Sequence, residues 1–210
     1  MRRTVRLIGR LLGRRTPKRR RSDLANGAQS SIAARTPRRR SGDPARHTSL
    51  GSIAKELAIN VGEAALDPRT IETLDGITLV PKMLETALRD ELFCLDAYSV
   101  EFAIERVKVM PGALRRELIA EYREKLADLG ADLDVYASRA EAYADRLAAE
   151  LRLAHTGVVR GISATVGEAF DAHLGTDNAL LADAVGRRFI DRSEVLKEYV
   201  EAAVREMAGG

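Results

Sequence analysis

The sequence predicts an all-α protein, with a helical bundle or long helical hairpin preceded by a basic, disordered segment. Apolar residues make up 45% of the 210 positions, whereas aromatic residues make up 4% and tryptophan is absent. The core must therefore be built from Leu, Ala, Val and Ile, of which Ala and Leu favour helices. After residue 48, apolar residues recur at three- and four-residue spacing, and no segment longer than a few residues alternates as a strand does.

Charge divides the chain into two parts. Residues 1–47 contain 15 Lys and Arg and two acids, a net charge of +13, whereas the remainder contains 19 basic and 29 acidic residues, a net charge of −10. Residues 16–47 are rich in Ser, Gly, Pro and Ala, and so cannot bury enough apolar surface to offset chain entropy. We therefore expect a disordered basic tail over 1–47 and an acidic helical body over 48–207.

Three helices are expected in the first half of the body. The first carries apolar residues at four-residue spacing, namely Ile53, Leu57 and Val61. An N-cap aspartate before a proline predicts a short helix over 67–76, and residues 77–80 are expected to be extended. A long helix over 81–109 has apolar residues on more than one side, which places it at the centre of the core.

The next two helices flank Gly130. The first follows a Pro-Gly turn and carries Leu114, Leu118, Tyr122 and Leu126. The second begins near Ala131, and its apolar seam is close to the heptad of a coiled coil with one slip: Leu133, Tyr136, Ala140, Tyr143, Leu147, Leu151 and Ala154. This seam can pack inside the chain or pair with partner helices. We expect a homo-oligomer, because several tails on one assembly gain avidity.

The last part of the body is expected to hold two further helices, over 178–190 and 194–207, with Ser193 capping the second. Before them, Gly157, Gly161 and Gly167 weaken any helix. These glycines predict either a hinge or tight helix crossing, or a break between helices.

The basic clusters of the tail predict contact with a polyanion. The planar guanidinium group of arginine can donate two hydrogen bonds to the oxygens of a phosphate, and each contact releases counterions. No aromatic residue lies in the tail, so bases have nothing to stack on, and binding to the nucleic-acid backbone is expected. The candidate contact residues are Arg14, Arg15, Lys18, Arg19, Arg20, Arg21, Arg38, Arg39 and Arg40.

Two other interpretations of the tail remain open. Residues 1–15 can form a short amphipathic helix with Val5, Ile8, Leu11 and Leu12 on one face, which suits an anionic membrane surface. The arginine-rich, acid-poor composition also suits a cleaved organelle-targeting segment. The sequence carries no secretory signal and no spanning helix, so a cytoplasmic location is expected, with an organelle as the alternative.

Two serines in the tail each follow three arginines. Ser22 follows Arg21, and Ser41 follows Arg40. Phosphate added at either serine would cancel part of the tail's charge. Both are therefore candidate phosphorylation sites that would weaken polyanion binding.

The remaining reactive residues do not form a motif for catalysis, and no cofactor or metal is expected. His47, His155 and His173 lack the Glu-x-x-His spacing of helical metal sites and are expected on the surface. Cys94 lies in an apolar helix beside acids and is expected to be a buried, inert thiol. The carboxylates of the long helix are expected to form a solvated face or an ion-pair network: Glu85, Asp90, Glu91, Asp96, Glu101 and Glu105. The sequence thus predicts a non-enzymatic accessory or structural protein, or alternatively a helical scaffold or assembly factor.

Overall fold

The structure, a computed structural model, describes residues 49–65, 67, 70, 74, 84–153 and 161–209. These residues form α2 (Leu50–Ala65), α4 (Glu85–Glu105), α5 (Gly112–Asp128), α6 (Leu133–Leu153), α7 (Ile162–Leu174) and α8 (Ala179–Gly209). The predicted all-α class is confirmed. The predicted tail over 1–47, with its arginine clusters, Ser22 and Ser41, lies outside the described residues, as does the predicted extended segment over 77–80.

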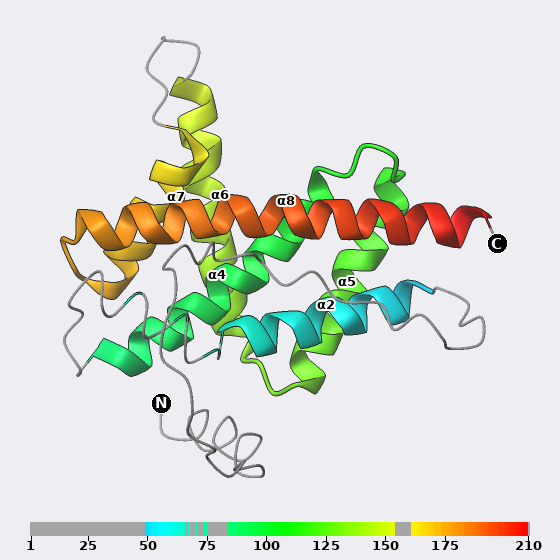
Figure 1. The fold of residues 1–210 in the computed structure, drawn as a ribbon, viewed down its shortest axis with the longest axis horizontal. Coiled ribbons are helices and arrows are strands. Elements are labelled where there is room, and N and C mark those ends of the chain that lie inside the picture. The colour runs from blue at the N-terminus through cyan, green and yellow to red at the C-terminus, as the bar shows by residue number, and fades with distance from the viewer. Residues whose placement is uncertain are drawn as a thin grey trace, which may run out of the picture.

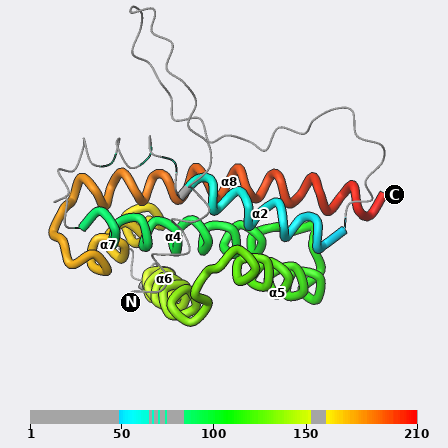
Figure 2. Tube along the Cα trace, turned by 90° about the horizontal axis from the view of Figure 1, so that it is seen from below, coloured from blue at the N-terminus to red at the C-terminus, as the bar shows by residue number. Residues whose placement is uncertain are grey.

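Helix α4 is the centre of the bundle, as its sequence predicted. Thirteen of its 21 residues are buried. In Figures 1 and 2, α8 runs along one side of α4, while α5 and α6 lie on the other side. Helix α2 packs against both α4 and α5. Since neighbours cover α4 from several directions, its apolar residues are not confined to one stripe.

Helix α4 is shorter than the predicted span of 81–109. It ends at Glu105, after which the N–H groups of Arg106 and Val107 donate to carbonyls three positions earlier. The guanidinium of Arg115 then donates to the carbonyl oxygens of Val107 and Met110 over 2.9 and 3.2 Å. Pro111 disfavours helix in the residue before it, which explains why α4 cannot run directly into α5.

The two helices flanking Gly130 form as predicted, with Gly130 at a φ of 88° between them. Four residues of the predicted seam are buried within the chain: Tyr136, Ala140, Tyr143 and Leu147. Leu133 is half-buried, and Ala154 lies outside the described residues. The C-terminal end of α6 projects from the bundle in Figure 1, and Leu151 there is 66% exposed. Most of the seam therefore packs inside the chain, which is the first of the two alternatives.

The prediction of two separate C-terminal helices is wrong, because α8 is one helix of 31 residues. Ser193, predicted as a cap, lies buried within it, and its hydroxyl donates to the carbonyl oxygen of Ile190 over 3.0 Å. This local bond satisfies the hydroxyl without ending the helix. Buried apolar residues lie on both sides of Ser193, among them Phe189 and Leu196, so both halves of the helix contribute to the core.

Helix α7 was not predicted, because its glycines suggested a break or a hinge. Gly161, with a φ of 87°, precedes the helix, and Gly167 lies buried within it. A methyl group at Gly167 would lie 1.9 Å from the carbonyl oxygen of Ala182, and one at Gly186 would lie 2.1 Å from that of Ser163. Gly167 therefore marks a tight crossing of α7 and α8, the first of the two alternatives, whereas Gly161 lies between α6 and α7, which is the second. Gly157 lies outside the described residues.

Candidate functional site

Three acids of α4 are buried, and they follow one another at five-residue spacing: Glu91, Asp96 and Glu101. Five residues of an α-helix correspond to a rotation of about 140°. The three carboxylates therefore point to three different sides of α4. Each meets cationic side chains from other helices, so the acids connect α4 to its surroundings.

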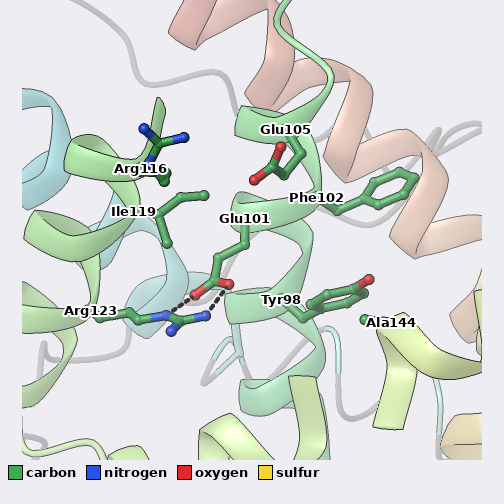
Figure 3. A pocket seen from close by; sticks show the side chains of 8 residues that line it. All are labelled: Tyr98, Glu101, Phe102, Glu105, Arg116, Ile119, Arg123 and Ala144. Carbon is green, nitrogen blue, oxygen red and sulfur yellow. Dashed lines mark hydrogen bonds and ion pairs between the residues drawn. The ribbon is translucent and has the colours of Figure 1, made fainter. Parts of the chain in front are cut away.

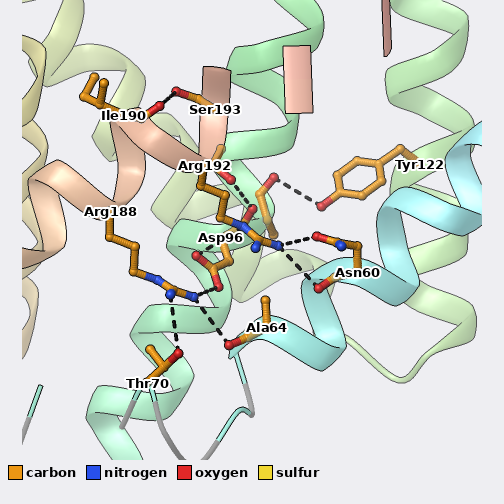
Figure 4. A network of polar contacts seen from close by, with 11 residues as sticks. Asn60, Ala64, Thr70, Asp96, Tyr122, Arg188, Ile190, Arg192 and Ser193 are labelled. Carbon is orange, nitrogen blue, oxygen red and sulfur yellow. Dashed lines mark hydrogen bonds and ion pairs between the residues drawn. The ribbon is translucent and has the colours of Figure 1, made fainter. Parts of the chain in front are cut away.

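Asp96 connects α4 to α8. Nη2 of Arg188 donates to its Oδ2 over 2.7 Å, and Nε of Arg192 lies 3.5 Å from its Oδ1, as Figure 4 shows. The Asp96 side chain is only 2% exposed. Because the two arginines lie one turn apart on α8, a single carboxylate contacts both of them.

The same two arginines also hold the C-terminal end of α2. Arg192 donates to the side-chain oxygen of Asn60 over 2.9 Å and to its carbonyl oxygen over 3.3 Å. Arg188 donates to the carbonyl oxygen of Ala64 over 3.4 Å. The last carbonyls of a helix carry partial negative charge. The carbonyl of Ala64 lies in this last turn and therefore adds to Asp96 in balancing the charge of Arg188.

Glu91 connects α4 to α6 and α7. The hydroxyl of Tyr143 donates to its Oε1 over 2.6 Å, and Nδ1 of His173 lies 2.7 Å from the same oxygen. Nε of Arg139 lies 3.1 Å from Oε2. The ring of Tyr143 also packs edge-on against His173, with centroids 5.1 Å apart. Both oxygens of this buried carboxylate are thus engaged by side chains of the protein.

Glu101 connects α4 to α5. Nε and Nη2 of Arg123 donate to its two oxygens, each over 2.7 Å. This bidentate pair lies at the edge of an open groove of about 380 Å³ between α4, α5 and α6, shown in Figure 3. The groove is lined by Tyr98, Glu101, Phe102, Glu105, Arg116, Ile119, Arg123 and Ala144. Acids and arginines occur together in this lining, so the groove favours neither sign of charge.

Cys94 is buried in α4, as predicted. Burial raises the pKa of its thiol to about 12, and the neighbouring charges of Glu91 and Asp90 act in the same direction. Burial is also the main cause of the raised pKa of Asp90. A thiol of this kind is protonated at neutral pH and is a poor nucleophile.

The structure changes the interpretation of two groups of predicted residues. His173 was expected on the surface, but its side chain is only 14% exposed and contacts Glu91. His47 and His155 lie outside the described residues. Of the α4 carboxylates, the ion-pair alternative holds for the three buried ones and also for Glu85 and Glu105, which pair with Arg89 and Arg115. Asp90 is exposed.

Sequence reasoning did not identify the cationic partners of the α4 acids: Arg123, Arg139, His173, Arg188 and Arg192. One available signal was the five-residue spacing of acids within an apolar helix. Another was the placement of Arg188 and Arg192 beside the buried Val185 and Phe189 of α8. Neither signal could show which acid meets which base.

Many of the body's basic residues are engaged by its own acids. In the described part of the chain, eleven of them form ion pairs: Arg89, Arg106, Arg115, Arg123, Lys125, Arg139, Arg187, Arg188, Arg192, Lys197 and Arg205. One of these pairs, between Arg106 and Glu194, lowers the pKa of Glu194 through its hydrogen bond. Most basic residues in the described part of the body are therefore paired with its own acids.

Among the described residues, no helix is long and apolar enough to cross a membrane. No group of three or more His, Cys, Asp or Glu side chains within that same part is arranged to hold a metal ion. Comparison with protein-family models, with curated proteins and with solved structures finds no match to this chain.

Proposed function

We propose that this chain is a non-enzymatic accessory or structural protein that binds a polyanion, and nucleic acid first, through the basic tail over 1–47. The observation that carries the proposal is the division of charge, +13 in the tail against −10 in the remainder. Such a segment is attracted to phosphate backbones and releases their counterions on binding.

The ion pairs of the body support a model in which the tail binds the polyanion and the body does not. Arg123, Arg139 and Arg188 hold α4 to α5, α6 and α8, so their charges are paired within the bundle. The tail contains only two acids, Asp23 and Asp43, and so cannot neutralise its own 15 bases. In this proposal the body is a scaffold that carries the tail.

Self-association would increase the avidity of the tails. The seam of α6 offers little surface for it, because Tyr136, Ala140, Tyr143 and Leu147 are buried within the chain. An oligomer of this protein would therefore have to form through another surface. Sedimentation of the full chain at several concentrations measures whether one exists.

The test uses the full chain and two variants with equal loss of charge. One replaces Arg19, Arg20 and Arg21 by Gln, and the control replaces the exposed Arg146, Arg152 and Arg205 by Gln. Binding to a short DNA duplex is measured over a range of salt concentrations. Affinity falls as salt rises, and the loss of three phosphate contacts makes this fall less steep. The magnitude of the slope of log affinity against log salt decreases by about 3 in the tail variant, whereas the control keeps the wild-type slope.

Binding to anionic vesicles of phosphatidylserine and phosphatidylcholine shows whether the tail prefers a lipid surface or nucleic acid. The apolar residues Leu11 and Leu12 favour a lipid surface, and their replacement by Ser weakens vesicle binding only if the tail inserts there. If the wild-type chain binds vesicles more tightly than DNA, the result supports a membrane-surface scaffold in place of a nucleic-acid-binding protein. A wild-type chain that binds neither contradicts the proposal.

A further inference from the structure

We propose that the part of the tail next to the body, residues 38–47, docks on an acidic face of α5, and that a polyanion must displace it. The effect on polyanion affinity rests on the proposed function, whereas the contact between residues 38–47 and α5 does not depend on it. The face carries Glu117, Glu121, Glu124 and Asp128, named here the acidic stripe. Four observations on the fold and the chain lead to this inference.

The acidic stripe lies along one side of α5. Its residues follow steps of four, three and four, which bring side chains onto the same face of a helix. Glu124 and Asp128 are 65% and 62% exposed. Lys125 pairs with both, at 3.8 and 3.1 Å, so the stripe keeps an excess of three negative charges.

The basic residues of α5 lie on a different side of the helix. Arg116 and Arg123 line the groove between α4, α5 and α6, where Arg123 pairs with Glu101, as Figure 3 shows. Arg115 lies 3.5 Å from Glu105. The arginines of α5 therefore face the acids of α4 and leave the acidic stripe without their charge.

The described chain begins beside the acidic stripe. Ser49 and Ser52 cap the first turn of α2 reciprocally, each side-chain oxygen accepting the backbone N–H of the other over 3.2 and 3.0 Å. A methyl group at Gly51 would lie 3.8 Å from Oε2 of Glu121. The first turn of helix α2 therefore lies against the surface of α5.

The preceding segment matches the acidic stripe in charge and reach. Residues 38–47 carry four arginines and one aspartate, a net charge of +3. An extended chain spans about 3.5 Å per residue, so Arg40 lies within about 39 Å of Gly51, whereas the stripe is about 16 Å long. Tethering gives the segment an effective concentration on the order of millimolar at α5.

Docking of this segment lowers the apparent affinity for a polyanion, because only the undocked fraction offers all its arginines. The contact joins exposed charges, so salt screens it. The inference therefore predicts a masking effect that is strong at low salt and absent at high salt.

The binding test compares two full-length variants with the same gain in net charge. One carries E117Q, E121Q, E124Q and D128N in the acidic stripe, and the control neutralises four exposed acids elsewhere, with E141Q, D145N, D191N and E198Q. At low salt the stripe variant binds a short DNA duplex about tenfold more tightly than the control, and the difference disappears as salt rises. Equal affinities of the two variants at low salt overturn the proposal. Helix content at 222 nm verifies that both variants fold.

A second measurement needs no polyanion and so separates this inference from the proposed function. Backbone amide resonances of the full chain are compared with those of R38Q/R39Q/R40Q at low salt. Shifts centred on residues 117–128 support docking even if no DNA or vesicle binding is found. Unchanged resonances there overturn docking, and shifts that depend on protein concentration overturn it as well, since they assign the contact to a second copy.

Discussion

Asp96 on α4 and Arg188 on α8 lie 92 positions apart in the sequence, yet a hydrogen bond of 2.7 Å joins them in the core of the bundle. The carboxylate also contacts Arg192, and the two arginines extend to the C-terminal end of α2. One buried acid therefore joins three helices.

Replacement of Asp96 by Asn is expected to destabilise the protein strongly, because it leaves two largely buried guanidinium groups without their carboxylate. Breaking a buried pair in this way costs about 3–5 kcal/mol of unfolding free energy. Urea denaturation followed by circular dichroism measures it. The control is D183N, which removes the exposed pair with Arg187 and is expected to change stability little, because solvent screens that pair. Equal effects of both variants would show that Asp96 has no special role.

Replacement of Gly167 by Ala is expected to destabilise the crossing of α7 and α8. The added methyl group would lie 1.9 Å from the carbonyl oxygen of Ala182, which is backbone and cannot rotate away. We expect a loss of about 3 kcal/mol, at the upper end of overpacking costs. Gly62 of α2 is the matched control, because a methyl group there meets no atom within 4 Å. G62A is expected to raise stability by about 0.5–1 kcal/mol, and a stable G167A would contradict the tight crossing.

Alkaline pH is expected to unfold the protein through its buried tyrosines. Burial raises the pKa of Tyr98 to about 12 and raises that of Tyr122, Tyr136 and Tyr143 further above the ordinary value. The unfolded chain loses these protons near pH 10 while the folded protein retains them, so stability falls as pH rises above about 10. Tyrosinate absorbance near 295 nm should rise together with the loss of helical circular dichroism. Ionisation of these four tyrosines in a fully helical protein would contradict the prediction.

The thiol of Cys94 is expected to be unreactive in the folded protein. It is buried, and its pKa of about 12 keeps it protonated at the pH of a usual disulfide-exchange assay. An aromatic disulfide reagent at pH 8 should label it only as fast as the chain opens. The same protein in concentrated guanidinium chloride should react at its single cysteine at once. Equally fast labelling in both conditions would show that the thiol is accessible.

Phosphate at Ser22 and Ser41 is expected to weaken polyanion binding, because each serine directly follows an arginine cluster. The double variant S22D/S41D should bind DNA more weakly than S30D/S31D, which adds the same charge away from the clusters. Fluorescence anisotropy with a labelled duplex at low salt measures the difference. Equal binding by the two variants would remove the regulatory interpretation.

Local patterns in the sequence were sufficient for much of the fold. Ile53, Leu57 and Val61 repeat at helical spacing, and all three are buried on α2. The Pro-Gly and Gly turns bound α5 as expected, because backbone preferences of these residues act without tertiary contacts. The central position of α4 followed from apolar residues on more than one of its sides, which only neighbours on several sides can cover.

The candidate site depended on tertiary structure instead. Gly167 weakens a helix locally, but its close packing on α8 compensates, and α7 forms. Ser193 is a good cap in isolation, but the packing of α8 on α4 and α7 continues the helix through it. The pairing of Glu91, Asp96 and Glu101 with bases up to 92 residues away could not be read from spacing, because any of the body's 19 bases could meet any of its acids. Sequence periodicity sets which face of each helix is apolar, whereas the choice of partner for a buried charge requires the helices to be assembled.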